Sequence, residues 1–343
     1  MRTYLKKALL KPETEAADIQ QAVATILADI ERGGDAEALA YAAKFDRYPG
    51  PTRVTDEMIA QAAAQVPQKL KDDIQFAHDN VRRFAELQKA TVQDFEAELL
   101  PGFVTGQKSI PVDAAGCYIP GGRYSHISSA IMTVTTAKVA GCQHITACSP
   151  PHPDTGVAPA ILNAAHVSGA DQILAMGGVQ AIAAMTFGLF GLPKAHILVG
   201  PGNQYVAEAK RQLFGRVGID MVAGPTDSLI LADATADPHI VATDLVSQAE
   251  HGYNSPVWLV TNCKVLAEAV LDAVPKLITA LPELNRINAE AAWRDYAEVI
   301  LCDTRADMVA TSDENAPEPP TVQAGHPDRW QTRVAHYGRF CTG

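Results

Sequence analysis

The stretch HILVGPGNQYVAEAKRQLF (residues 196–214) joins a short apolar run, a turn of glycine, proline and asparagine, and a segment with helical spacing. Its pattern predicts a strand over His196–Val199 and a helix over Gln204–Phe214. Glycine lets a backbone approach a ligand closely, and the first amides of a helix attract anions. The stretch therefore predicts a strand-turn-helix unit. Its turn is either an ordinary tight turn, which is the commoner case, or a site for a pyrophosphate or an adenosine hydroxyl.

The same unit recurs along the chain and sets the fold class. Apolar runs that end in glycine or proline turns occur at Ala114–Ile119, His144–Cys148, Gln172–Met176, Ser228–Ala232 and Pro256–Thr261. Helix-like segments follow several of them, and Asp237 with Pro238 marks a helix start. Alternating strands and helices predict an α/β protein with parallel sheets covered on both faces. Before residue 100 the spacing predicts helices only, over Ala16–Arg32, Asp35–Phe45 and Thr55–Glu86.

Composition excludes several classes of protein. A chain of 343 residues with 47% hydrophobic and 20% charged residues is typical of a folded protein with two domains. Its net charge of -11 argues against a nucleic-acid partner. No apolar run reaches membrane-spanning length. The basic residues at the N-terminus are not followed by the apolar segment and cleavage site of a signal peptide. The six cysteines form no C-x-x-C pair, so we expect reduced thiols, Cys117 included, in a cytoplasmic protein.

The segment QAEHG (residues 248–252) closes the helix that begins near Asp237. Gln248 and His251 are three residues apart, so they project from one helical face. An amide oxygen and an imidazole nitrogen there could supply two ligands to Zn²⁺, although such a pair is more often solvated or satisfied within a core.

Five motifs in this order and spacing resemble the histidinol dehydrogenase family of zinc- and NAD-dependent alcohol dehydrogenases. They are GCYIPGG (116–122), GGVQ (177–180), VGPGN (199–203), AGPTD (223–227) and QAEHG (248–252). The resemblance implies two Rossmann-like domains, one inserted in the other, with a helical N-terminal segment and an architecture like that of aldehyde dehydrogenases. We expect the inserted domain at residues 118–226 and the discontinuous domain at 1–117 plus 227–343.

The resemblance also implies roles for single residues. Tyr118, Gln180 and Asn203 would contact NAD, each at the carboxyl end of a strand. Thr226 would touch the substrate with its hydroxyl, with a turn hydroxyl that caps its own backbone as the alternative. Gln248 and His251 would bind both Zn²⁺ and substrate. The family takes its other two zinc ligands from later segments, one of them from the partner subunit of a homodimer, and this sequence stops at Gly343 before them.

The family's catalytic pair lies in an Ala-Pro-Glu-His-Leu motif, where Glu activates water and His takes the alcohol proton. Here the segment 316–320 reads Ala-Pro-Glu-Pro-Pro. Glu318 is kept as the candidate catalytic residue, whereas Pro319, which has no titratable group, stands where the base would be.

Further sequence segments resemble one branch of the family, the sulfopropanediol 3-dehydrogenases. These details are GRYSHISSA (122–130), Thr226 in place of the usual Ser, AEHGYNSPVWL (249–259) and WRDYAEVILC (293–302). The predicted substrate is therefore a small polar alcohol, 2,3-dihydroxypropane-1-sulfonate, oxidised through an aldehyde to 3-sulfolactate. One alternative is oxidation of L-histidinol to L-histidine. Another is a truncated, catalytically inactive NAD-binding remnant with weakened dimerisation.

Overall fold

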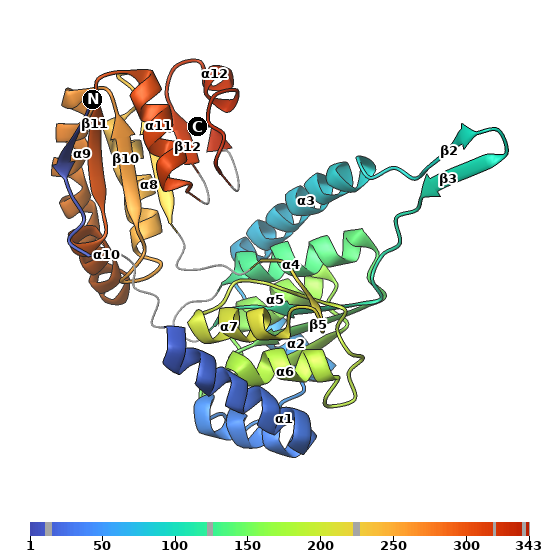
Figure 1. Cartoon of the computed structure of the whole chain (residues 1–343). Helices are drawn as coiled ribbons and strands as arrows, with labels where there is room; N and C mark the ends of the chain where they lie inside the picture. Colours follow the sequence, from blue (N-terminus) through green and yellow to red (C-terminus); the bar gives the residue numbers. More distant parts are fainter. Residues whose placement is uncertain (11–15, 122–125, 222–226, 318–319, 338–340, 343) are drawn as a thin grey trace. The chain divides into compact units, whose positions relative to one another are not determined.

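The structure of the chain is a computed structural model that describes all residues except 11–15, 122–125, 222–226, 318–319, 338–340 and 343 (Figure 1). It divides into two compact units. Unit 1 comprises residues 1–14 and 224–343, and unit 2 comprises residues 15–223. The chain thus enters unit 1, builds the whole of unit 2, and returns to complete unit 1.

Unit 2 is built on a parallel five-stranded sheet in the order β6-β5-β4-β7-β8. Its strands are β4 (Ala114–Tyr118), β5 (His144–Ser149), β6 (Gln172–Ala175), β7 (Ile197–Val199) and β8 (Gly218–Ile219). The first four coincide with the predicted apolar runs to within one residue. β4, β5 and β6 are nearly all buried because both faces of a parallel sheet are covered.

Helices cover both faces of this sheet, and alternate strand residues select the face. Tyr118, Leu174 and Leu198 pack against the helices on one side, whereas Cys117 and Ile173 pack against those on the other. The first side carries α1 (Ala16–Phe45), α6 (Gly178–Phe187) and α7 (Gln204–Leu213); the second carries α2 (Asp56–Gln65), α3 (Gln68–Ala90), α4 (Ile127–Ala140) and α5 (Pro159–Ser168).

The N-terminal helices follow the predicted pattern of breaks. Gly34 has φ 62° and kinks α1 between the two predicted helices. Pro67 separates α2 from α3 within the predicted run 55–86. These helices pack inside unit 2, so the observed division lies at 14/15 and 223/224, whereas the sequence analysis placed residues up to 117 with the other domain. The apolar stripe of α1 explains the difference, because Val23, Ile26 and Ile30 share one core with α6 and α7.

A two-stranded ribbon, β2 (Phe95–Leu100) and β3 (Phe103–Gln107), follows α3 and was not predicted. It pairs antiparallel and forms a sheet of its own, and Figure 1 shows it extending beyond the end of α3. Large apolar side chains on it are exposed, among them Phe95, Leu100 and Phe103.

Unit 1 contains a six-stranded sheet in the order β1-β11-β10-β9-β12-β13, parallel except for β1 at the edge. The strands are β1 (Arg2–Lys6), β9 (Ser228–Ala232), β10 (Val257–Thr261), β11 (Glu298–Cys302), β12 (Pro320–Gln323) and β13 (Cys341–Thr342). Predicted strands at 228–232 and 256–261 are confirmed. One face carries α8 (Pro238–Ala249), α9 (Lys264–Thr279) and α10 (Glu283–Asp295), and the other carries α11 (Arg305–Asn315) and α12 (Pro327–Gln331).

Both parallel sheets have the same topology. Counted from the central strand, the chain order in space is 3-2-1-4-5, with β4 and β7 as strands 1 and 4 in unit 2 and β9 and β12 in unit 1. The order reverses between strands 1 and 4, and such a switch point opens a crevice at the carboxyl edge of a Rossmann-like sheet. The predicted α/β class with two Rossmann-like sheets, one inserted in the other, is confirmed. Within the described ranges, no helix is long and apolar enough to cross a membrane.

Candidate functional site

The switch point of unit 2 lies between the carboxyl ends of β4 and β7. A Cβ atom on Gly200 would come within 2.0 Å of the carbonyl oxygen of Tyr118, and Gly200 has φ +115°. No side chain fits at position 200, because the turn after β7 lies directly against the end of β4. The turn predicted from residues 196–214 is thus present, with its backbone at the crevice.

A buried lysine fixes this turn. Lys210 on α7 is 4% exposed, and its Nζ donates to the carbonyl oxygen of Gly200 at 3.0 Å and to the carboxylate of Asp220. Asp220 in turn accepts from the backbone N–H of Gly200 at 2.8 Å. Lysine and aspartate therefore hold both backbone polar groups of Gly200, which leaves the turn little freedom.

Asn203, a predicted NAD contact, caps α7. Its Oδ1 accepts from the amides of Tyr205 and Val206 at 3.0 and 3.1 Å, and its side chain is exposed. The alternative reading, an ordinary strand-to-helix turn, thus describes part of its role. Its side-chain N–H groups are the atoms with which Asn203 could donate to a ligand.

The structure brings Tyr118 and Gln180, the other two predicted NAD contacts, to the same loop. The hydroxyl of Tyr118 accepts from the N–H of Gly178 at 3.1 Å, and Gln180 lies in the first turn of α6, two residues later. Both side chains are buried. Burial raises the pKa of the Tyr118 phenol well above its ordinary value, so it stays protonated and does not serve as a base.

Asp46, which the sequence analysis did not single out, completes this cluster. It follows α1, and its Oδ2 accepts from the N–H of Gly177 at 3.2 Å and from Nε2 of Gln180 at 3.1 Å. Burial raises the pKa of the Asp46 carboxyl, although these two hydrogen bonds oppose the shift. Gly177 has no room for a side chain, since a Cβ there would lie 2.8 Å from Pro150 and 2.9 Å from Asp46 Oδ1.

The donors and the shape of this edge fit a dinucleotide. Phosphate groups bind well where backbone amides at a helix N-terminus can be reached closely. The glycine-containing turn at 200–203 ahead of α7 offers such a place. Burial raises the pKa of the Cys117 thiol to about 12, so the thiol stays protonated. All six cysteines are free, as predicted.

In unit 1 the candidate zinc ligands lie at the amino edge of the sheet, whereas the candidate NAD contacts of unit 2 lie at a carboxyl edge. The helix α8 runs back from the end of β9, so Gln248 and His251 lie near the start of β10, at the amino edge of the sheet. Gln248 is half-buried and His251 is exposed. Among the residues that the structure describes, no three His, Cys, Asp or Glu side chains gather closely enough to hold a metal ion. Two donors make half a zinc site, so the described residues alone do not fit the ion.

Asp244, one turn before Gln248, has a structural role. Its Oδ2 accepts from Nε2 of Gln323 at 2.6 Å, which ties α8 to β12, and burial raises the pKa of the carboxyl.

Thr226, Glu318 and Pro319 lie outside the described residues. The strands that follow them are neighbours, since Leu229 of β9 pairs with Pro320 of β12. The amide of Ser228 also donates to the carbonyl of Pro256 at the start of β10. The strands that follow the three candidate segments therefore all begin at one edge of one sheet.

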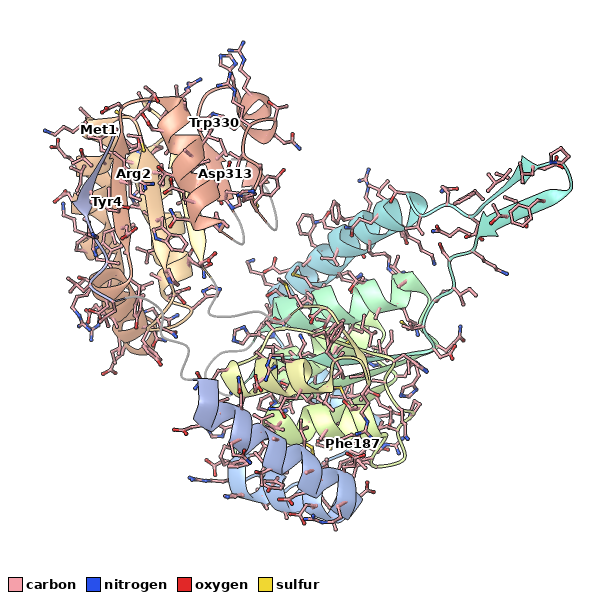
Figure 2. All side chains as sticks on the ribbon, in the orientation of Figure 1. Met1, Arg2, Tyr4, Phe187, Asp313 and Trp330 are labelled. Atoms are coloured by element: carbon pink, nitrogen blue, oxygen red, sulfur yellow. The ribbon has the colours of Figure 1, made fainter. Side chains whose placement is uncertain are left out.

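At the carboxyl edge of unit 1, Asp233 is held by several hydrogen bonds from its own unit. Asp233, at the end of β9, accepts from Thr235, from the amide of Gly325 and from Arg305 at 2.7 Å. Burial would raise the pKa of Asp233, but these hydrogen bonds outweigh it and hold the pKa below its ordinary value. Arg305 also lies 5.7 Å from the ring centre of Trp330, which Figure 2 labels.

Comparison with known proteins gives one consistent result. The histidinol dehydrogenase family model matches residues 9–343. Sulfopropanediol 3-dehydrogenase of Ruegeria pomeroyi is 69% identical over 340 residues, which cover 99% of this chain and 78% of the relative. Histidinol dehydrogenase of Methanosarcina barkeri is 37% identical over 338 residues, which cover 98% of this chain and 77% of the relative.

Solved structures agree on the fold. Histidinol dehydrogenase from Elizabethkingia anophelis superposes with a TM-score of 0.90 at 35% identity, covering 98% of this chain and 77% of that chain. An NAD-dependent benzaldehyde dehydrogenase from Corynebacterium glutamicum superposes with a TM-score of 0.51 at 12% identity, covering 94% of this chain and 83% of that chain. The second likeness concerns the fold alone and agrees with the predicted architecture like that of aldehyde dehydrogenases.

Proposed function

Because the chain belongs to the histidinol dehydrogenase family, we propose that it is an NAD-dependent dehydrogenase that oxidises a terminal alcohol through an aldehyde to a carboxylate. The reaction converts one alcohol, one water and two NAD⁺ into one carboxylate, two NADH and three protons. NAD, when bound, accepts the hydride at each of the two oxidations. Its proposed place is the carboxyl edge of the unit 2 sheet, with Tyr118, Gln180 and Asn203 beside it.

The proposed substrate is 2,3-dihydroxypropane-1-sulfonate, and the product is 3-sulfolactate. The observation that carries this proposal is the 69% identity to a sulfopropanediol 3-dehydrogenase over 99% of the chain. The alternative substrate, L-histidinol, is supported by relatives of markedly lower identity, 37% in the case of Methanosarcina barkeri.

The remaining proposed roles fall on unit 1. Thr226 would donate to or accept from a substrate hydroxyl, and Glu318 would take a proton from the water that adds to the aldehyde. Gln248 and His251 would hold Zn²⁺ and meet the substrate, with further ligands from outside the described residues. Pro319 cannot take the alcohol proton, so another group must do so. We further propose a cytoplasmic homodimer, as the family resemblance implies.

The substrate assignment is tested by initial rates of NADH formation. The purified chain with Zn²⁺ and NAD is given sulfopropanediol and L-histidinol separately. We expect a kcat/KM at least about 100-fold higher on sulfopropanediol. The wrong substrate would leave buried polar groups of the site without hydrogen-bond partners, which lowers kcat/KM by a factor of this size or more. A preference for histidinol would reverse the assignment, and no turnover on either would favour the inactive remnant, the reading that Pro319 supports.

Replacing His251 tests the proposed zinc site. Loss of a residue that only hydrogen-bonds to a metal ligand typically lowers metal affinity about 10- to 100-fold. We expect His251→Ala, which removes a proposed ligand itself, to lower zinc affinity by more than this. The measurement is zinc content after dialysis against a competing chelator, together with kcat. His239→Ala is the matched control, since His239 is exposed in the first turn of α8, the helix that ends shortly before His251. Equal zinc retention by both variants would rule His251 out as a ligand.

A further inference from the structure

Gln180 has its amide orientation dictated by Asp46. A carboxylate has no proton to donate, so the atom of Gln180 that lies 3.1 Å from Asp46 Oδ2 must be the nitrogen Nε2. The oxygen Oε1 then points the other way. The same Oδ2 also accepts from the N–H of Gly177 at 3.2 Å, so the carboxylate is anchored to the loop that precedes α6.

The amide oxygen Oε1 of Gln180 lies beside a glycine, Gly178. A Cβ on Gly178 would lie 3.0 Å from Oε1 and 3.4 Å from Nε2 of Gln180. Any larger residue at 178 would press on this oxygen, and the φ of +58° at Gly178 also favours glycine. The N–H of Gly178 donates to the hydroxyl of Tyr118, so the glycine beside the amide oxygen is held by a second proposed NAD contact.

We propose that Asp46 is a positioning residue of the NAD site, which fixes the Gln180 amide so that Oε1 is the atom offered to the cofactor. This inference rests on the proposed function. It means that the Gln180 subsite accepts a hydrogen bond and therefore selects a donor, such as a ribose hydroxyl, and disfavours a phosphate group at the same place. Asp46 acts through Gln180 and does not touch the cofactor.

An alanine at position 46 would remove this control, because Nε2 of Gln180 would lose its acceptor and the amide could turn over to offer its NH₂ group to the ligand. An asparagine would keep it, since an Oδ1 in the place of Oδ2 accepts from both Gly177 and Gln180. A glutamate at position 180 beside Asp46 would set two carboxylates against each other and disturb the same oxygen. With alanine at 46 and glutamate at 180 together, this repulsion is gone and an acceptor again faces the ligand.

The experiment is a double-mutant cycle read by calorimetric titration of NAD into the full chain, with no substrate present. We expect Asp46→Ala and Gln180→Glu each to raise the Kd for NAD about 10-fold, whereas Asp46→Asn should stay within about threefold of the wild-type Kd. The double variant, with alanine at 46 and glutamate at 180, should lose no more affinity than either single variant. Asp29→Ala is the matched control, because Asp29 is a hydrogen-bonded carboxylate on α1 that accepts only from Arg32 and Tyr41 among the described residues.

A merely structural role for Asp46 would not give this result, because the losses of the two single variants would then multiply to about 100-fold. A loss of about 100-fold, or an unchanged Kd in Asp46→Ala, overturns the inference. If Asp46→Ala does not fold, as judged by thermal unfolding, an unchanged Kd in Gln180→Glu overturns it equally. Wild-type chain that binds no NAD overturns the proposed cofactor and this inference together, whereas binding unaffected by the variants overturns the inference alone.

Discussion

Replacing Lys210 with methionine should destabilise unit 2 by about 2–4 kcal/mol. The substitution keeps most of the apolar volume but removes the ammonium that donates to Gly200 and pairs with Asp220. A buried carbonyl then loses its donor, and a carboxylate that is 32% exposed loses its partner. The melting temperature should fall by roughly 5–15 °C, and NAD affinity should fall with it because the turn at 200–203 loses its anchor.

Lys138→Met is the matched control for this experiment. Lys138 pairs with Asp171 at 3.6 Å in the same unit, but both side chains are more than a third exposed. An ion pair of this kind contributes at most about 1 kcal/mol. Equal losses of thermal stability in the two variants would contradict the clamp that we assign to Lys210.

Replacing Glu318 with glutamine should slow the second oxidation by about 10²–10⁴-fold. Glutamine cannot take a proton from the attacking water, so the aldehyde should accumulate after one NADH has formed. Moles of NADH per mole of sulfopropanediol, measured with an aldehyde-trapping reagent present, should fall from two toward one.

Glu314→Gln serves as the control for the Glu318 variant. Glu314 lies four residues earlier in the chain and pairs with Arg2 at the surface, so its loss should leave the stoichiometry unchanged. Full release of two NADH at the wild-type rate by Glu318→Gln would remove Glu318 from the catalytic role.

Most of the two parallel sheets could be predicted because each buried strand is a short apolar run that ends in a breaker. Ile230 and Leu231 show why the prediction works, since one packs on each face of the sheet and both positions must be apolar. The ribbon β2–β3 was missed for the opposite reason. Its side chains have no covering layer, so no alternation of buried and exposed residues marks it.

The positions of residues within the site were harder to predict than the motifs. Tyr118, Gln180 and Asn203 were found from motifs, and the structure places all three at the carboxyl ends of strands in one sheet. Asp46 carries no local pattern, because its partners are more than 130 residues away and reach it only through the packing of α1 on α6.

Lys210 did carry a signal that went unused. The buried residues of α7 are Val206, Ala209, Lys210 and Leu213, with the spacing of an apolar stripe. A lysine within such a stripe must find a buried partner, and here the partner is Asp220 together with the backbone of Gly200.

The measurement that tests the central claim most directly is the number of NADH molecules formed per molecule of sulfopropanediol by the purified chain, with the alcohol limiting and NAD and Zn²⁺ in excess. We expect two, with 3-sulfolactate as the product. A value of one would show that the reaction stops at the aldehyde and would contradict the proposed role of Glu318. A value of zero from folded chain would contradict the proposed enzyme.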